Sequence, residues 1–406
     1  LDVNSGAVHL LDDISYAVSG LLDENMGDTC PQSIIDALPD YTADEIREAY
    51  DELYELKKAG QLFAQDDYID VSRYIPVNAP VKALCLHVAH DCNLRCQYCF
   101  ASTGDFGQGR KIMPPEIAKK AIDFVIARSG VRHNIEVDFF GGEPLMAWDT
   151  VTQTVDYARS LEEKYNKKFR FTITTNGLLL DEDKRKYINE NMDNCVLSLD
   201  GRREVNDEFR KTVAGTGSYD TIVPKFKALV DERDPNLDYY ARGTFTSHNL
   251  DFAEDVLSIA DAGFDRLSVE PVTADPGCGY DLTEDDLPKI EAEYDRLTDI
   301  MLERKKEGKP FTFFHFMVDL DQGPCVVKRL RGCGAGYEYV AVTPDGDIYP
   351  CHQFVGKEEF KQGSVLDQSF DMDIAQKFAG MNIYSRPKCQ KCWAKFYCSG
   401  GCSAAN

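Results

Sequence analysis

The sequence has little positive charge, no long apolar run and no internal repeat, and these features exclude several classes of protein. Asp and Glu outnumber Lys and Arg by 69 to 45, which gives a formal net charge of −24. Because a surface of that charge repels phosphates, we expect no nucleic-acid partner. No stretch has the apolar length that a membrane helix needs, so we expect no membrane partner. The first residues, LDVNSGAVHLLDD, lack the basic start and apolar run of a secretory signal, which predicts a cytoplasmic protein.

The cysteines are the most unusual part of the composition. The apolar and charged fractions, 43% and 28%, are ordinary for a globular protein, and 406 residues predict two or three domains or one barrel with appendages. Cytoplasmic thiols stay reduced, so 14 cysteines indicate metal or cluster ligation rather than disulfides. Cys30, Cys85 and Cys195 stand alone in apolar or helical surroundings and are predicted to be buried, inert thiols. Most of the others lie in tight groups.

Residues 1–75 predict a small winged-helix unit. A short alternating run at 7–11 precedes three helical patterns, at 14–22, 33–38 and 42–59, and a return segment follows at 61–70. Thr42 and Glu45 have the spacing of a capping box, which predicts the start of the third helix. Residues 71–80, with prolines at 76 and 80, are a predicted linker.

From residue 81 to about 310, strand and helix patterns alternate. The six predicted strands are residues 83–90, 135–140, 169–175, 195–200, 239–247 and 266–271. Repeated units of this kind predict the α/β class, with a parallel sheet forming a partial (β/α)6 TIM-like barrel and an active site at the carboxyl ends of its strands. Beyond residue 310 the alternation stops, and Pro344-Asp345-Gly346 predicts the turn of a hairpin.

Three cysteines follow the first predicted strand: Cys92, Cys96 and Cys99. Thiolates are the soft ligands of iron–sulfur clusters, and three of them leave one iron of a [4Fe–4S] cluster open to a substrate or cofactor. A zinc knuckle is the alternative. Structural zinc needs four ligands, however, and the nearest fourth candidate, His90, lies only two residues before Cys92. We therefore predict an iron–sulfur cluster.

This cysteine run, CNLRCQYC, has an aromatic residue before its last cysteine and resembles the motif of the radical S-adenosylmethionine (SAM) superfamily. The resemblance implies that SAM chelates the open iron and is cleaved to methionine and a 5′-deoxyadenosyl radical. Other segments resemble SAM-contacting segments of the superfamily: Gly141-Gly142-Glu143-Pro144, Thr175-Asn176-Gly177, Ser198-Leu199-Asp200-Gly201, and Arg242.

These segments carry more detailed expectations. The glycines at 141 and 142 are expected to leave room for SAM, and Glu143 to receive its ammonium group. Arg242, inside an apolar strand, is expected to bind a carboxylate, with a surface ion pair as the alternative. Tyr98 is predicted either to pack near adenine or to fill the mouth of the barrel.

The carboxy-terminal cysteines resemble, in order and spacing, the SPASM domain of radical SAM enzymes, which we assign to residues 311–406. The resemblance implies two auxiliary [4Fe–4S] clusters, and therefore three clusters in all. The first would be held by Cys325, Cys333, Cys351 and Cys402, and the second by Cys389, Cys392 and Cys398. Relatives supply a further ligand downstream of Asn406, so either the sequence is truncated, which we favour, or one iron is open. A zinc ribbon is the alternative for the last four cysteines, and Cys325 is either a ligand, a displaceable ligand or a spectator.

The segments CNLRCQYCFA, FFGGEPL and YPCHQFVG together resemble the SCIFF-peptide maturases over nearly the whole chain. The resemblance implies an enzyme that joins a cysteine sulfur to a backbone carbon in a cysteine-rich precursor peptide made on the ribosome. The winged-helix unit would bind the leader of that peptide at a sheet edge, and a flavodoxin- or ferredoxin-type protein would supply electrons.

Two alternatives to that function are open. One is a sulfatase-maturing enzyme that forms formylglycine, and the other is a non-catalytic iron–sulfur or peptide-binding protein. Cys278, which follows the sixth strand, is either a proton or radical shuttle or a loop thiol without a role.

Overall fold

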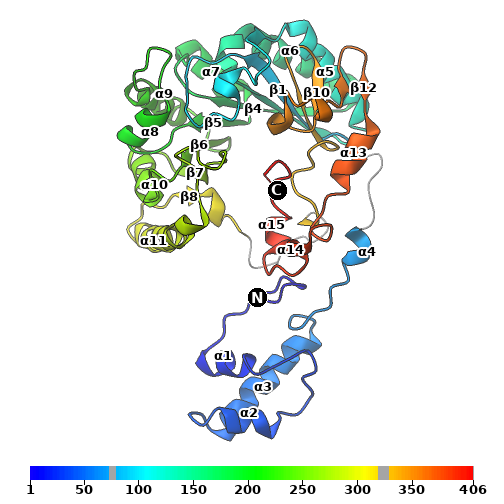
Figure 1. Cartoon of the computed structure of the whole chain (residues 1–406), viewed down its shortest axis with the longest axis vertical. Helices are drawn as coiled ribbons and strands as arrows, with labels where there is room; N and C mark the ends of the chain where they lie inside the picture. Colours follow the sequence, from blue (N-terminus) through cyan, green and yellow to red (C-terminus); the bar gives the residue numbers. More distant parts are fainter. Residues whose placement is uncertain (73–78, 319–328, 406) are drawn as a thin grey trace.

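The computed structural model describes residues 1–72, 79–318 and 329–405 (Figure 1). Its described strands form one twelve-stranded sheet, with the order β12-β11-β10-β9-β1-β3-β4-β5-β6-β7-β8 and with β2 (Lys111–Ile112) paired to β1. The predicted strands are present, each within two residues of its expected bounds. They are β1 (Ala83–His90), β3 (Asn134–Gly141), β4 (Lys168–Thr175), β5 (Asn194–Ser198), β6 (Asp238–Phe245) and β7 (Arg266–Pro271).

These six strands are parallel and adjacent in chain order, so their carboxyl ends lie at one edge of the sheet. Strand β1 is buried at every position, because β3 and β9 flank it on its two sides. In β3 and β4 buried and less buried residues alternate, which places every second side chain in the apolar core. The sheet continues beyond the six strands, and the closed (β/α)6 arrangement stays a prediction.

Helices connect the parallel strands and pack on the sheet. They are α5 (Pro115–Arg128), α6 (Trp148–Tyr165), α7 (Glu182–Asn191), α8 (Arg203–Phe209), α9 (Tyr219–Asp231), α10 (Phe252–Asp261) and α11 (Leu287–Lys306). Helix α5 shows how the sequence directs this packing. Pro115 occupies its first turn, and Ala118, Ala121, Ile122 and Val125 recur at helical spacing and are buried.

The carboxy-terminal region extends the same sheet rather than forming a separate one. Strand β9 (Tyr339–Val342) pairs parallel with β1 and antiparallel with β10 (Asp347–Tyr349), which confirms the hairpin predicted around residue 345. At the other edge, β8 (Thr312–Phe313) pairs with β7. The predicted domain boundary at residue 310 therefore falls inside a continuous sheet. The remaining elements are β11 (Gly363–Ser364), β12 (Ser369–Phe370), α13 (Met372–Ala379), α14 (Pro387–Gln390) and α15 (Lys395–Cys398).

Short 3-10 turns complete the described fold. They are η1 (Ser102–Gly104), η2 (Pro144–Ala147), η3 (Glu284–Asp286), η4 (Phe314–Phe316), η5 (His352–Phe354) and η6 (Glu358–Phe360).

The amino-terminal unit is helical. It contains α1 (Asp13–Ser19), α2 (Gln32–Ala37), α3 (Ala43–Lys58) and the short α4 (Ile69–Ser72). The capping box of α3 is confirmed, since Thr42 accepts from the Glu45 N–H and Glu45 accepts from the Thr42 N–H. Residues 7–11 and 61–68 form no strand among the described residues. Instead, side-chain hydrogen bonds such as His9 Nε2 to the Gln61 carbonyl join these segments, so the winged-helix assignment stays a prediction.

The amino-terminal unit contacts the cysteine-rich segment at the carboxyl end. Figure 1 shows α14 and α15 between the unit and the sheet. Asp66 accepts a hydrogen bond from Lys395 Nζ at 2.6 Å and another from the Tyr384 hydroxyl, and Lys395 is only 6% exposed. Val3 and Tyr68 pack on a small core that contains Phe396. The ion pair therefore joins the two ends of the chain.

Asp66→Asn is expected to destabilise this junction by about 1.5–3 kcal/mol, because a buried ammonium loses a charged partner. The measurement is the melting temperature of the purified protein. Glu55→Gln is the control, since the Glu55–Lys58 pair is exposed and such pairs contribute little. Equal melting temperatures of the two variants would contradict the structural role of Asp66.

Two further expectations concern the whole chain. No helix in the described ranges is long and apolar enough to cross a membrane. Cys85 and Cys195 are buried, as predicted, but the prediction was wrong for Cys30, which is only half-buried because it lies at the margin of the small amino-terminal core. Cys278 is exposed.

Candidate functional site

A pocket of about 300 Å³ lies at the carboxyl ends of the parallel strands. The loop after β1 and the ends of β3, β4, β5, β6 and β7 all contribute side chains, and His352 and Gln353 of η5 complete the wall. The predicted site residues in the lining are Cys92, Cys96, Tyr98, Cys99, Gly141, Gly142, Glu143, Asn176, Ser198 and Arg242. Segments that are far apart in the sequence therefore converge here, as the parallel strand order requires.

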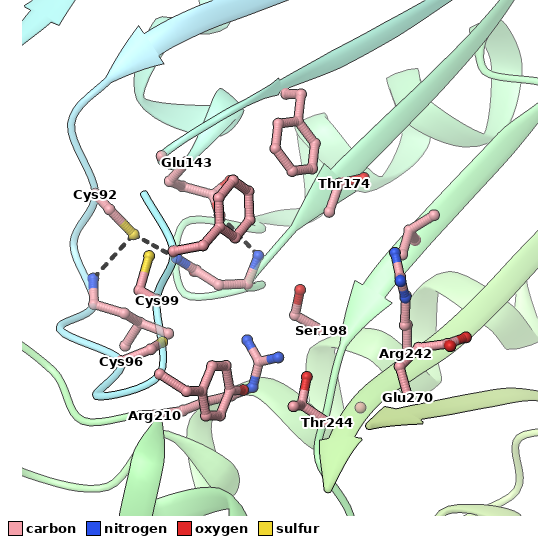
Figure 2. Close-up of a pocket in the computed structure, with 18 of the residues that line it drawn as sticks. Cys92, Cys96, Cys99, Glu143, Thr174, Ser198, Arg210, Arg242, Thr244 and Glu270 are labelled. Atoms are coloured by element: carbon pink, nitrogen blue, oxygen red, sulfur yellow. Dashed lines mark hydrogen bonds between the residues drawn. The ribbon is translucent and has the colours of Figure 1, made fainter. Parts of the chain in front are cut away.

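The three cysteines share one side of this pocket (Figure 2). Cys92 Sγ accepts hydrogen bonds from the Leu94 N–H at 3.4 Å and from Asn176 Nδ2 at 3.5 Å. Burial and nearby acidic groups raise the pKa of Cys92 to about 12, and burial raises the pKa of Cys96 to about 11. The thiolate forms therefore need a strong positive charge beside them, which a metal centre supplies.

The glycines at the end of β3 have a packing role in addition to the one expected. A Cβ at Gly141 would lie 2.3 Å from the Ala89 carbonyl oxygen, and a Cβ at Gly142 would lie 2.1 Å from the Asp91 carbonyl oxygen. The glycines thus let the end of β3 pack against the chain that leads from β1 into the cysteine loop. They hold that loop in place, and the expectation that they only make room for SAM was incomplete.

Gly142→Ala is expected to destabilise the protein by about 1–3 kcal/mol and to lower the iron bound per chain, because the added methyl group displaces the Asp91 backbone. The measurements are the melting temperature and the iron content after anaerobic reconstitution. Gly27→Ala is the control, since a Cβ there meets nothing within 4 Å. A full iron content in Gly142→Ala would show that the loop tolerates this displacement.

Glu143 is fully buried and organises the next strand end. Its Oε1 accepts from the Leu145 N–H and the Thr175 hydroxyl, and its Oε2 accepts from the Asn176 N–H at 2.7 Å. Burial raises the pKa of this carboxyl to about 7, although these hydrogen bonds oppose the shift. A cation at the pocket face of Glu143 would therefore favour its ionised form. Pro144 does not line the pocket: it is buried at the start of η2, because a proline in the first turn directs the chain inward.

Asp200 does not line the pocket but lies behind it. This corrects the prediction that Asp200 contacts SAM. The carboxylate is completely buried, accepts from the Tyr98 hydroxyl at 2.5 Å and from the Thr244 N–H at 3.0 Å, and pairs with Arg210 Nε at 3.0 Å. These partners occupy the oxygens that SAM would need. Tyr98 and Arg210 line the pocket in its place, beside the cysteine loop.

Sequence analysis did not identify Arg210, Glu270 or His352, although all three line the pocket. Arg210 is the residue that caps the end of α8, and no local pattern distinguishes it from a surface arginine. Glu270 is the last residue but one of β7 and pairs with His315 Nε2 at 2.9 Å. His352 stands in the YPCHQF segment next to Cys351; burial and the Arg242 charge lower its pKa to about 4.

The carboxy-terminal cysteines lie in two groups. Cys351 is close enough to Cys333 and Cys402 for their charges to add to the effect of burial in raising its pKa, to about 11. Cys389 and Cys392 lie on and just after α14, and Cys398 ends α15. The assignment of these cysteines to two auxiliary clusters stays a prediction. Cys325 lies outside the described residues.

Comparison with known families matches two parts of the chain. Residues 86–240 match the radical SAM superfamily, and residues 333–393 match the SPASM iron–sulfur cluster-binding domain. The chain carries a radical SAM domain followed by a SPASM domain. It therefore binds SAM and [4Fe–4S] clusters, the cofactors of these two domains.

Relatives of known description share much of this radical SAM–SPASM chain. A cysteine-type anaerobic sulfatase-maturating enzyme of Clostridium novyi is 25% identical, and the match covers 77% of this chain and 85% of that protein. The radical SAM cyclopropyl synthase TigE of Paramaledivibacter caminithermalis is 24% identical, with 82% and 70% covered.

Two solved structures have the same fold. The structure of anSMEcpe with bound AdoMet is 22% identical with a TM-score of 0.65, and the match covers 80% of this chain and 90% of that chain. The structure of Streptococcus suis SuiB with bound S-adenosylmethionine is 18% identical with a TM-score of 0.56, and the match covers 98% and 90%. A match that covers 98% of the chain has to include most of residues 1–72.

The radical SAM pocket suits a cluster better than a single ion. Zinc binds sulfur at about 2.3 Å, so a zinc site brings its ligands into mutual contact. Within residues 1–72, 79–318 and 329–405 no group of three His, Cys, Asp or Glu side chains is arranged to hold a single metal ion. The three thiols line one side of a pocket of about 300 Å³, which leaves room for the larger [4Fe–4S] group.

Proposed function

We propose that this protein is a radical SAM maturase that forms a thioether between a cysteine sulfur and a backbone carbon in a cysteine-rich precursor peptide. The observation that carries the proposal is the composition of one pocket. Its wall contains both the cysteine loop and His352, the neighbour of the SPASM residue Cys351. A substrate in this pocket lies between the site where a radical starts and a second site that can accept an electron.

The amino-terminal unit supports a peptide substrate. Residues 1–72 lie outside both family matches. The structure of SuiB bound to its precursor peptide SuiA nevertheless matches 94% of the chain, which has to include most of these residues. The segment at 7–11 is not paired in the described sheet, and Leu10 is fully exposed. Ala7 is hydrogen-bonded to Asp2 and Ser5, but the backbone groups of residues 8–11 make no hydrogen bond in the described structure, and such a segment is suited to hold a leader peptide by strand pairing.

We assign the two ends of SAM to residues beside the cysteine loop. The ammonium group is assigned to the pocket face of Glu143, because a nearby cation would lower the pKa that burial has raised. The carboxylate is assigned to Arg210 and Ser198. Asp200 fixes Arg210 and Tyr98 in position through its buried contacts. The bound cofactors supply reductive cleavage of SAM and removal of a hydrogen atom from the substrate.

The remaining roles belong to the chain itself. The pocket walls position the peptide and exclude water, which is the main contribution that a protein makes when its cofactor performs the difficult step. We assign Cys333, Cys351 and Cys402 to a first auxiliary cluster and Cys389, Cys392 and Cys398 to a second, for three clusters in total. A flavodoxin- or ferredoxin-type protein is the proposed reductant.

Formylglycine formation is the second candidate, and the match to sulfatase-maturating enzymes favours it. One experiment separates the two candidates. Anaerobically reconstituted protein is incubated with SAM, dithionite and a cysteine-rich peptide, and the product is fragmented by mass spectrometry. Thioether formation removes two hydrogens and keeps the sulfur, whereas formylglycine formation from cysteine loses the sulfur. Absence of 5′-deoxyadenosine and methionine would instead support a non-catalytic iron–sulfur protein.

A further inference from the structure

Two arginines line the pocket on different sides. Figure 2 shows Arg210 beside Cys96, and Arg242 together with Glu270 on the other side of the pocket. The strand register explains this separation, since Arg242 stands on β6 between Ser198 of β5 and Ser268 of β7, away from the loop after β1. The amino-acid end of SAM has to reach the cysteine loop, so Arg210 is better placed for it than Arg242.

The Arg242 guanidinium is available to a ligand. Arg210 pairs with Asp200, but Arg242 makes no side-chain hydrogen bond or ion pair with any residue in the described ranges. Its nearest acidic neighbour, Glu270, already accepts from the Ser268 hydroxyl at 2.6 Å and lies 2.9 Å from His315 Nε2. The other nitrogen of His315 contacts the Tyr294 hydroxyl at 2.8 Å.

The charges around Arg242 leave it as the accessible positive group on this side. Burial raises the pKa of Glu270, but the hydrogen bonds from His315 and Ser268 and the charges of His315 and Arg242 outweigh burial and lower it to about 2. Glu270 is therefore ionised and already satisfied by its own partners. His352 also lines the pocket, where its ring centroid lies 5.4 Å from that of Phe100, the residue after Cys99, while Arg210, Glu143 and the three thiols lie on the cysteine-loop side.

We propose that Arg242 binds the reacting cysteine of the peptide substrate as its thiolate. This inference rests on the proposed function and assigns the substrate side of the same pocket. The position is suitable because Arg242 and His352 line the same pocket, and His352 directly follows Cys351 in the chain. Ionisation breaks the S–H bond, leaves both electrons on sulfur and releases the proton to water at the mouth of the pocket.

The expected size of the effect follows from ordinary thiol chemistry. A free cysteine has a pKa of about 8.5, so only a few per cent is thiolate at neutral pH. An opposite charge at contact distance lowers such a pKa by about 1–3 units. The affinity of the enzyme for the peptide should therefore increase about ten- to thousandfold as the pH rises from the bound to the free thiol pKa.

The affinity of the enzyme for the peptide tests whether Arg242 binds the thiolate, and the measurement needs no cleavage of SAM and no modification of the peptide. The holoenzyme is loaded with SAM but given no reductant, and fluorescence anisotropy measures its affinity for a labelled peptide with one cysteine between pH 5.5 and 9. Matched peptides carry selenocysteine or serine at the same position. We expect the cysteine peptide to bind more tightly with rising pH, the selenocysteine peptide to bind tightly already at acid pH, and the serine peptide to bind independently of pH.

Substitutions then assign the effect to Arg242. Arg242→Gln should lose most of the pH-dependent gain, and Arg242→Lys should keep part of it because the charge remains. Arg304→Gln, which changes a half-buried arginine of α11 that does not line the pocket, should behave as the wild type. Selenocysteine should also restore modification by Arg242→Gln more than cysteine does, since the selenol ionises without help.

Three results would overturn the inference. The first is a pH-independent loss of affinity in Arg242→Gln for all three peptides, which indicates a substrate carboxylate as the ligand. The second is a loss of SAM affinity in that variant, which returns Arg242 to the role that sequence analysis predicted. The third is a pH dependence of cysteine-peptide affinity in Arg242→Gln that equals that of the wild type. Failure of the proposed function alone would leave the pH-dependent affinity intact but give no modified peptide with the wild type.

Discussion

Alanine at Cys92, Cys96 or Cys99 is expected to abolish SAM cleavage. Each thiol faces the pocket at the carboxyl end of β1, and a cluster held by only two of them loses its iron or its geometry. Formation of 5′-deoxyadenosine should fall to the background of the assay without enzyme. The measurement is liquid chromatography of anaerobic reactions with dithionite, together with the electron paramagnetic resonance signal of the reduced cluster.

Cys278→Ala is the matched control for these variants. Cys278 is also a cysteine in a loop after a barrel strand, but it is exposed and does not line the pocket. It should retain the wild-type rate of SAM cleavage and the wild-type cluster signal. If the loop variants also retained cleavage, the assignment of the SAM-binding cluster to residues 92–99 would be wrong.

Alanine at Cys333 or Cys351 is expected to leave SAM cleavage in place but to remove peptide cross-linking. These cysteines lie near Cys402 in the SPASM region and not in the loop after β1. Their loss would remove the proposed electron acceptor, while SAM would still reach the first cluster. The ratio of 5′-deoxyadenosine to modified peptide should therefore rise from near unity to a large value.

The comparison that decides this division of roles uses both sets of variants in one assay. Cysteine-loop variants should lose both products, and SPASM variants should lose only the modified peptide. Cys195→Ala, which changes a buried thiol of β5 outside both groups, controls for the general loss of a cysteine. Equal loss of both products in both sets would contradict separate roles for the two regions.

Local patterns predicted the strands, α5 and the hairpin because each depends on neighbouring residues. The six strands were found from apolar segments separated by helical patterns, and the cap of α3 from Thr42 and Glu45. The cysteine loop was equally visible, since three ligands within eight residues need no information about the fold. The placement of these loops at one end of the sheet followed from the parallel strand order.

Contacts between distant segments were harder to predict. The glycines at 141 and 142 were interpreted as space for SAM, but they pack against the backbone after β1, which is about fifty residues earlier in the sequence. Asp200 was expected to touch SAM, but Tyr98, Arg210 and the Thr244 N–H occupy its oxygens. The alternating run at 7–11 does not form a strand in the described part, where the His9 side chain, rather than backbone pairing, contacts the Gln61 carbonyl.

The sequence by itself determined the type of chemistry, because cluster ligands close together in the chain, and the strand that presents them, are local properties. Only the tertiary structure decided which arginine lies beside the cysteine loop and which lies across the pocket from it. Sequence analysis identified Arg242, which stands in an apolar strand, and missed Arg210. Arg210 pairs with the buried carboxylate of Asp200, whereas Arg242 projects from β6 without such a partner in the described structure. The order and register of the strands decide which groups each arginine meets.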